Sequence, residues 1–157
     1  MKRPIYFCKS WFRAKKRSTE VWSEEQARIA HANRQLYTVL IDSVERPYCF
    51  LEVTEKFVGV CFLDELLREK LTYQFQEVES GKLFLTMATY REFEGETDKV
   101  VNGTSYMFAQ DGATQIRREF FNPHRLETAN SSSDVSMNYD VMPEFGEYDR
   151  LIRVERS

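Results

Sequence analysis

The sequence predicts a strand-rich α+β protein: a curved antiparallel β-meander of about 7–9 strands, curled into a barrel or half-barrel, with one N-terminal helix. Three observations predict it. Aromatic residues make up 14% of the chain, and they suit a pleated, β-rich core. Short apolar runs separated by turn residues follow one another from about residue 36 onward. A single capped helical pattern precedes them, and because no boundary or repeat interrupts the 157 residues, we expect one domain, 1–157.

The N-terminal third begins with a loosely alternating strand over 4–13 and a basic, then polar, loop over 14–22. Ser23 and Gln26 have the spacing of a capping box, which predicts a helix over 23–35. Leu36, Leu40 and Val44 would let that helix continue to about residue 44. The run 36–41 is also rich in β-branched and aromatic residues, and we favour a strand there.

The remainder reads as a meander. The expected strands are 48–54, 57–64, 71–76, 82–93, 103–110, 113–121 and 134–141. Turns or loops are expected at 55–56, 66–69, 80–81, 94–102, 122–123 and 129–133. Asp111-Gly112 is the strongest hairpin signal. Leu151, Ile152 and Val154 are expected to close the core.

The charge, the lack of targeting segments and the cysteine spacing argue against several classes of protein. A formal charge of −3 and a pI near 5.5 argue against direct nucleic-acid binding, which needs a basic face. No stretch resembles a secretory signal or a membrane span, so we expect no membrane contact and a cytoplasmic location. Cys8, Cys49 and Cys61 form no CxxC pair and are expected as buried thiols in a reducing compartment.

Catalytic motifs are missing from the sequence: there is no GxxxxGK[ST], GxGxxG, HExxH or GxSxG. His31 and His124 are too distant in sequence to suggest a metal site, and we expect no cofactor and no enzymatic activity. A carboxylate pair drawn from Glu92, Glu94, Glu96 and Asp98 would be the basis of an enzyme alternative.

The most distinctive segment is 135–151, VSMNYDVMPEFGEYDRL, in which acids alternate with aromatics. Aromatics supply anchoring area, and acids complement a basic surface such as a nuclease cleft. The candidate partner-binding residues are Tyr139, Asp140, Glu144, Phe145, Glu147, Tyr148 and Asp149, with Glu94, Glu96 and Asp98 as a second patch. Alternatively, Phe145 and Tyr148 pack into the core. Some residues of the segment can bind a partner while others pack into the core.

Residues 57–97 and 134–156 resemble small bacterial immunity proteins that accompany polymorphic or contact-dependent growth inhibition toxins. The resemblance is carried by Phe62-Leu63-Asp64, Leu71-Thr72-Tyr73, 83–87 (LFLTM), Gly103-Thr104 and 143–146 (PEFG). It implies a protein that binds a cognate toxin, such as a nuclease, and occludes its active site or partner surface. A lipocalin-like carrier of a small ligand is the alternative that the aromatic meander leaves open.

Overall fold

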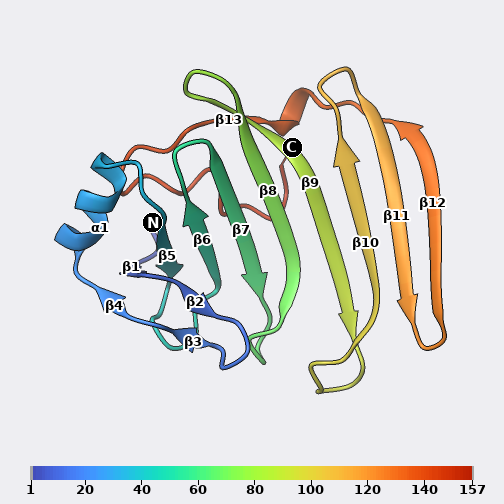
Figure 1. Cartoon of the computed structure of the whole chain (residues 1–157), viewed down its shortest axis with the longest axis horizontal. Helices are drawn as coiled ribbons and strands as arrows, with labels where there is room; N and C mark the ends of the chain where they lie inside the picture. Colours follow the sequence, from blue (N-terminus) through green and yellow to red (C-terminus); the bar gives the residue numbers. More distant parts are fainter. Residues whose placement is uncertain (1, 157) are drawn as a thin grey trace.

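One large antiparallel sheet forms the body of the protein (Figure 1). The computed structural model describes residues 2–156. Its sheet runs in the order β12-β11-β10-β9-β8-β7-β6-β5-β1-β4, and β13 pairs with the part of β9 that β10 leaves free. The strands of this sheet are β1 (Ile5–Cys8), β4 (Val21–Trp22), β5 (Tyr37–Ile41), β6 (Cys49–Val53), β7 (Phe57–Leu63), β8 (Glu69–Glu79), β9 (Lys82–Phe93), β10 (Val100–Phe108), β11 (Ala113–Phe121), β12 (His124–Ser132) and β13 (Tyr139–Val141). A separate hairpin joins β2 (Trp11–Phe12) to β3 (Arg17–Ser18).

The strand-rich antiparallel meander with one helix is confirmed, but the closed barrel is wrong. The end strands β12 and β4 do not pair with each other, so the sheet stays open. Within the described residues the sheet has eleven strands rather than 7–9. A barrel buries its interior by curling the sheet on itself. Here the C-terminal segment, residues 134–156, crosses one face instead and fills the core with Tyr148, Leu151 and Ile152.

The helix α1 (Glu24–Ala32) begins at the predicted capping box. Ser23 accepts from the Gln26 amide, and the Gln26 side chain accepts from the Ser23 amide in return. The helix ends before residue 35 because Arg34 adopts a positive φ of 58°. The strand alternative for 36–41 is therefore confirmed as β5.

Two segments differ from expectation. Residues 124–132 form β12, although a polar loop was expected over 129–133 and no element was predicted over 124–128. All nine residues are exposed, so no apolar alternation marks the strand. Residues 134–141 were expected as one strand with Val135, Met137, Tyr139 and Val141 on one face. Only β13 is extended there, after a 3₁₀ turn at Ser136–Asn138, and Val141 is exposed while Val135 is buried.

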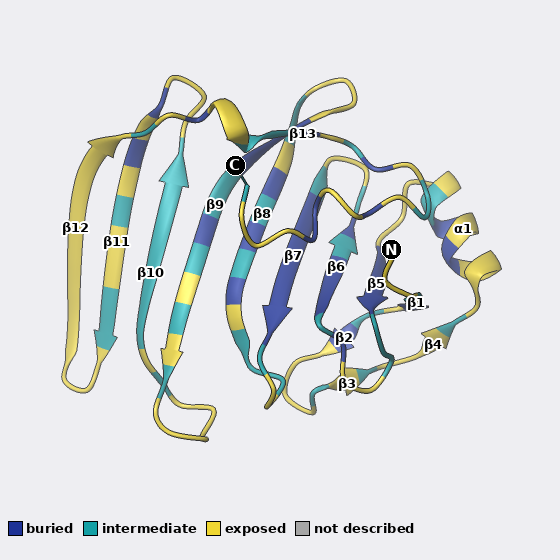
Figure 2. Cartoon of the chain, turned by 180° about the vertical axis from the view of Figure 1, so that it is seen from behind, coloured by how far each residue is buried: buried dark blue, intermediate teal, exposed yellow. Residues whose placement is uncertain are grey.

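The two faces of the sheet are covered by different segments. On one face, α1 and the C-terminal segment pack over β5–β8 with the main buried core (Figure 2). On the other, hairpin-side face, the β2–β3 hairpin covers a smaller cluster around Trp11, Phe50 and Cys61. Strands β11 and β12 carry mostly exposed residues. The single α-helix within residues 2–156 has nine residues and falls well short of what a bilayer crossing requires.

Candidate functional site

Two aromatics of the predicted C-terminal site, Phe145 and Tyr148, pack against the protein's own core. Tyr148 is 1% exposed, and its hydroxyl lies 2.8 Å from the Tyr37 hydroxyl, which in turn lies 2.8 Å from Nδ1 of His31. Phe145 stacks on Phe7 with ring centroids 5.1 Å apart. Burial raises the pKa of the Tyr148 hydroxyl, so it stays protonated as a hydrogen-bonding group. Both aromatics therefore anchor the C-terminal segment to its own sheet.

Asp140 also has internal partners. Its side chain is 3% exposed and accepts from Nη2 of Arg156 at 2.8 Å and Nε of Arg150 at 2.9 Å. Burial alone would raise the pKa of this carboxyl, but the hydrogen bonds from the two guanidinium groups outweigh burial and hold the pKa below its usual range. Tyr139 packs on Phe84, with ring centroids 4.9 Å apart. In this fold the partner-binding prediction must be corrected at Asp140 and Tyr148, since neither side chain is accessible.

The remaining predicted acids are exposed, but they form two separate groups. Glu144, Glu147 and Asp149 lie on the C-terminal segment. Glu94, Glu96 and Asp98 lie on the β9–β10 loop, at the opposite end of the sheet from β13 (Figure 1). Several are paired with bases of the same chain: Glu147 with Lys2 at 2.8 Å, and Asp98 with Lys16 at 2.6 Å. The acids thus do not combine into one strongly negative surface.

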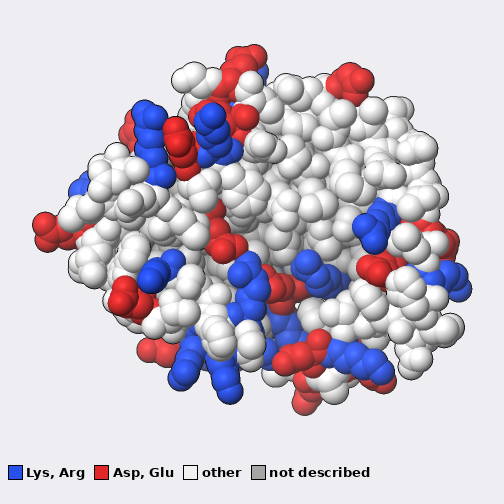
Figure 3. Space-filling view, in the orientation of Figure 1, with Lys and Arg blue, Asp and Glu red and all other residues white. Residues whose placement is uncertain are grey.

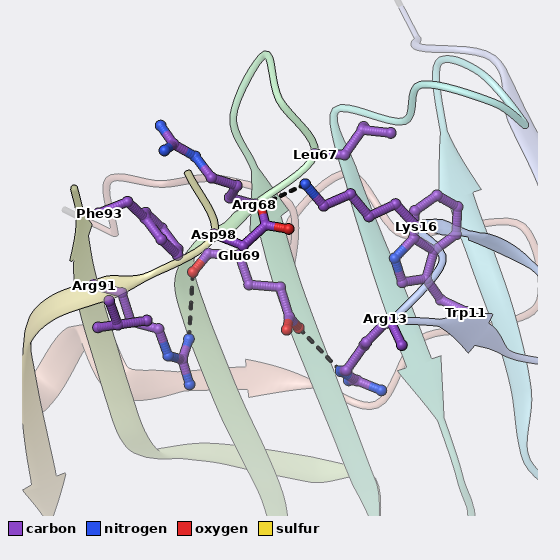
Figure 4. Close-up of a pocket in the computed structure, with 11 residues that line it drawn as sticks. Trp11, Arg13, Lys16, Leu67, Arg68, Glu69, Arg91, Phe93 and Asp98 are labelled. Carbon is purple, nitrogen blue, oxygen red and sulfur yellow. Dashed lines mark hydrogen bonds and ion pairs between the residues drawn. The ribbon is translucent and has the colours of Figure 1, made fainter. Parts of the chain in front are cut away.

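A cleft of about 380 Å³ opens instead on the hairpin-side face, between the β2–β3 hairpin and the ends of β8–β10 (Figure 4). Its lining residues are Trp11, Arg13, Ala14, Lys16, Leu67, Arg68, Glu69, Arg91, Phe93, Asp98 and Val100. Arg13 donates to Glu52 at 2.7 Å and to Glu69 at 3.1 Å, which fixes the hairpin against β6 and β8. Arg13 and Lys16, two of the bases at residues 13–17, make their contacts here.

The opposite wall of this cleft is held by the loops at 64–68 and 94–99. Arg68 donates to Asp64 at 2.8 Å and to the carbonyl of Thr97 at 2.7 Å. Lys16 reaches the same loops through Asp98 and through the Leu66 carbonyl at 3.0 Å. Asp98, one of the predicted acids, is therefore part of the cleft, and the walls are cross-linked by ion pairs between segments distant in sequence.

A second hollow of about 360 Å³ continues the cleft across β9–β11, and both are lined by Arg91 and Val100. Its centre is Gly103, which pairs with Arg91 on one side and Glu119 on the other. A Cβ at Gly103 would meet only the Tyr90 carbonyl oxygen at 3.7 Å, an ordinary contact, and its φ is not positive. The backbone does not require glycine here, so its effect is to leave the hollow open.

Above this hollow the hairpin-side face carries little charge. One row across β8–β12 consists of uncharged residues: Gln74, Met87, Met107, Gln115 and Asn130. Figure 3 shows this side, with a broad uncharged area over the upper part of β8–β12 and charged side chains along the bottom and at mid-height over β11 and β12. We call this uncharged row and the two hollows below it the open face.

The ionisable groups around the cleft have partners within the chain. Cys61 lies 3.8 Å from Arg13, yet burial, reinforced by Glu69, raises the pKa of its thiol to about 12, so the thiolate is scarce at neutral pH. Among residues 2–156, no three His, Cys, Asp or Glu side chains gather as metal ligands. The cleft carboxylates of Glu69 and Asp98 each accept from a base of the hairpin.

A scan against models of known families found no match for the chain, and searches of curated proteins and of solved structures found none either.

Sequence reasoning did not find the open face. Arg13 ends the first expected strand, Arg91 lies inside another, and Gly103 appears in the sequence analysis only as the start of a strand and as part of the resemblance at Gly103-Thr104. The one signal in the sequence was Gly103 itself, because a glycine inside a strand marks a place where another group approaches the backbone.

Proposed function

We propose that this protein is an immunity protein that binds a cognate bacterial toxin domain, such as a nuclease, and occludes its active site or partner surface. The observation that carries the proposal is the open face: no segment within residues 2–156 covers the hairpin-side surface of β9–β12, although the same side of β5–β7 lies under the β2–β3 hairpin. A sheet extended beyond its own covering layers offers a rigid platform for another protein.

The distribution of charge supports a protein partner. An interface core is depleted in charged residues, and its rim is polar. The open face has this layout, with Gln74, Met87 and Met107 across its middle and charged side chains at its border. The border includes the β9–β10 loop with Glu94, Glu96 and Asp98, which would steer a basic toxin surface toward the platform. Glu144, Glu147 and Asp149 stay a second predicted contact, on the C-terminal segment.

Under this proposal the protein acts in the cytoplasm, as a stoichiometric inhibitor without a cofactor, and touches neither nucleic acid nor membrane. The carrier alternative is less well supported, because the sheet is open and Tyr148, Leu151 and Ile152 fill the space that a barrel would enclose. The enzyme alternative is less well supported, because Glu69 and Asp98, the two carboxylates that line the cleft, are each paired with a base of the hairpin.

The test is co-purification of this protein with the toxin domain encoded beside its gene. A charge placed in the uncharged row, Gln115→Arg, should weaken the complex at least about tenfold, because it would be desolvated in the interface core. Ile29→Arg on the outer surface of α1 is the matched control, since Ile29 is also exposed and lies away from the open face. If neither a neighbouring toxin domain nor any other product of that locus binds, the proposal fails.

A further inference from the structure

The outer edge of β12 is an unprotected sheet edge. All nine residues of β12 pair with β11 in unbroken register, without a bulge or a proline, and all nine are exposed. The other end of the sheet, β4, has only two residues. Long flat edges present a row of free backbone donors and acceptors, and proteins usually shorten, twist or cover them. Therefore β12 is the end of the sheet that is suited to pairing with another strand.

The register identifies which backbone groups are free. The Ser133 amide donates to the Gly112 carbonyl at 2.8 Å, one position beyond the Ala113–Ser132 pair. Bonded and non-bonded pairs alternate along an antiparallel ladder. The odd-numbered residues of β12 therefore bond to β11, and the even-numbered residues, 124 to 132, point their N–H and C=O groups outward.

The side chains around Leu126 make this edge complementary to itself. Arg125 and Glu127 flank Leu126 and lie on one face of the sheet, and their side chains are 63% and 54% exposed. Leu126 lies on the other face and is 46% exposed. A two-fold axis through Leu126 would bring each Arg125 opposite a Glu127 and would bring the two leucines together, which is what an isologous interface requires.

We propose that two copies of this chain pair antiparallel through β12, centred on Leu126, and join their sheets into one. The outward amides and carbonyls of His124, Leu126 and Thr128 form the new ladder. Arg125 and Glu127, which now pair with each other at 3.2 Å within one strand, exchange partners across the axis. Because the axis is perpendicular to the sheet, the open faces of both copies lie on the same side.

This dimer is independent of the proposed toxin binding, since it uses the strand edge and leaves the open face uncovered. A foreign strand is the other occupant that such an edge accepts. The self-complementary charges at Arg125 and Glu127 favour the second copy, because an unrelated strand would have no reason to match them in both directions.

The experiment measures the mass of the purified full chain by light scattering after gel filtration, over a concentration series. A dimer that dissociates on dilution is expected. Thr128→Pro removes an outward N–H and leaves the ladder with β11 intact, so it should abolish the dimer. Ser132→Pro is the matched control: it also removes an outward N–H, but position 132 lies beyond the paired stretch, and the dimer should persist. A monomer at every concentration overturns the proposal, as does a dimer that survives Thr128→Pro.

Charge reversal distinguishes self-pairing from any other edge contact. Arg125→Glu places two like-charged pairs across the axis and should raise the dissociation constant about tenfold. Arg125→Glu combined with Glu127→Arg restores both opposite pairs and should return it to within about twofold of the starting value. Failure of the double variant to recover, with circular dichroism showing an unchanged fold, overturns the pairing centred on Leu126.

Discussion

Three polar side chains, from α1, β5 and the C-terminal segment, form a buried chain of hydrogen bonds. The Tyr37 hydroxyl lies between His31 and the Tyr148 hydroxyl at 2.8 Å from each. Burial, with a smaller contribution from Arg28, lowers the pKa of His31, so the neutral ring is favoured in this network. Polar groups whose hydrogen bonds are all made inside the protein favour one packing of the three segments, because any other packing would break those hydrogen bonds.

The ion-pair cluster of Asp140 with Arg150 and Arg156 makes the stability of the protein depend on pH. Because the pKa of Asp140 is depressed in the folded state, its contribution is present above about pH 4, the unfolded pKa, and is lost as pH falls through the folded pKa. Asp140→Asn should lower the free energy of unfolding by about 2–3 kcal/mol at pH 7. Urea unfolding at pH 7 and pH 3 would measure it.

At pH 3 the difference between Asp140→Asn and the wild type should shrink, since the carboxyl in the unfolded chain, with a pKa near 4, is then mostly protonated. Asp149→Asn is the control, because Asp149 is exposed on the same segment. Equal stability of the wild type and Asp140→Asn at pH 7 would contradict the role assigned to the cluster.

At the scale of elements, two glycines in the β9–β11 region differ in whether the backbone requires a glycine. Gly112 adopts a φ of 92°, and a Cβ on it would lie 2.7 Å from the Ser133 carbonyl oxygen. Gly103 has ordinary backbone geometry and leaves room for a Cβ. The first glycine is required by the hairpin that the Asp111-Gly112 pair predicts, and the second shapes the surface of the strand.

Alanine at these two positions should therefore behave differently. Gly112→Ala should cost about 2 kcal/mol or more, because both the left-handed backbone and the contact with Ser133 oppose it. Gly103→Ala should be neutral or slightly stabilising, by up to about 1 kcal/mol, since glycine in a strand interior is itself unfavourable. Guanidinium unfolding of the two variants gives both values, and a larger loss at Gly103 would refute this assignment.

The whole molecule is a sheet of which one half has a core and the other half extends from it. Strands β5–β7 are buried almost throughout, whereas β12 is exposed along its full length (Figure 2). Local stability follows the density of buried apolar contacts. The covered half therefore supports the uncovered one, which is the part that the proposed partners contact.

Amide hydrogen exchange should resolve these two halves. In dilute protein, the bonded amides of β6 and β7 should exchange about a hundredfold or more slowly than those of β11 and β12. Exchange measured by NMR residue by residue would test this. Uniform protection from β6 to β12 would indicate a single cooperative unit and would contradict the division into two halves.

The sequence by itself determined the local elements. Three elements are specified locally: the capping box at Ser23, the Asp111-Gly112 hairpin and the alternation in β8. Their short-range hydrogen bonds and periodic burial depend only on residues that are close together in the sequence. The sequence could not determine β12, because its residues are all exposed and show no alternation of apolar and polar side chains. It also could not determine that the sheet is open, because closure depends on how strands distant in sequence curl relative to one another.

Only the tertiary structure decided which candidate residues face solvent. The acid–aromatic segment was one pattern in sequence, yet Asp140 and Tyr148 are buried while Glu144 and Asp149 are exposed. The open face joins Arg13, Arg91 and Gly103 from three distant segments, and their adjacency arises from strand register and long-range ion pairs. No local pattern encodes such contacts, since they depend on the packing of the whole sheet.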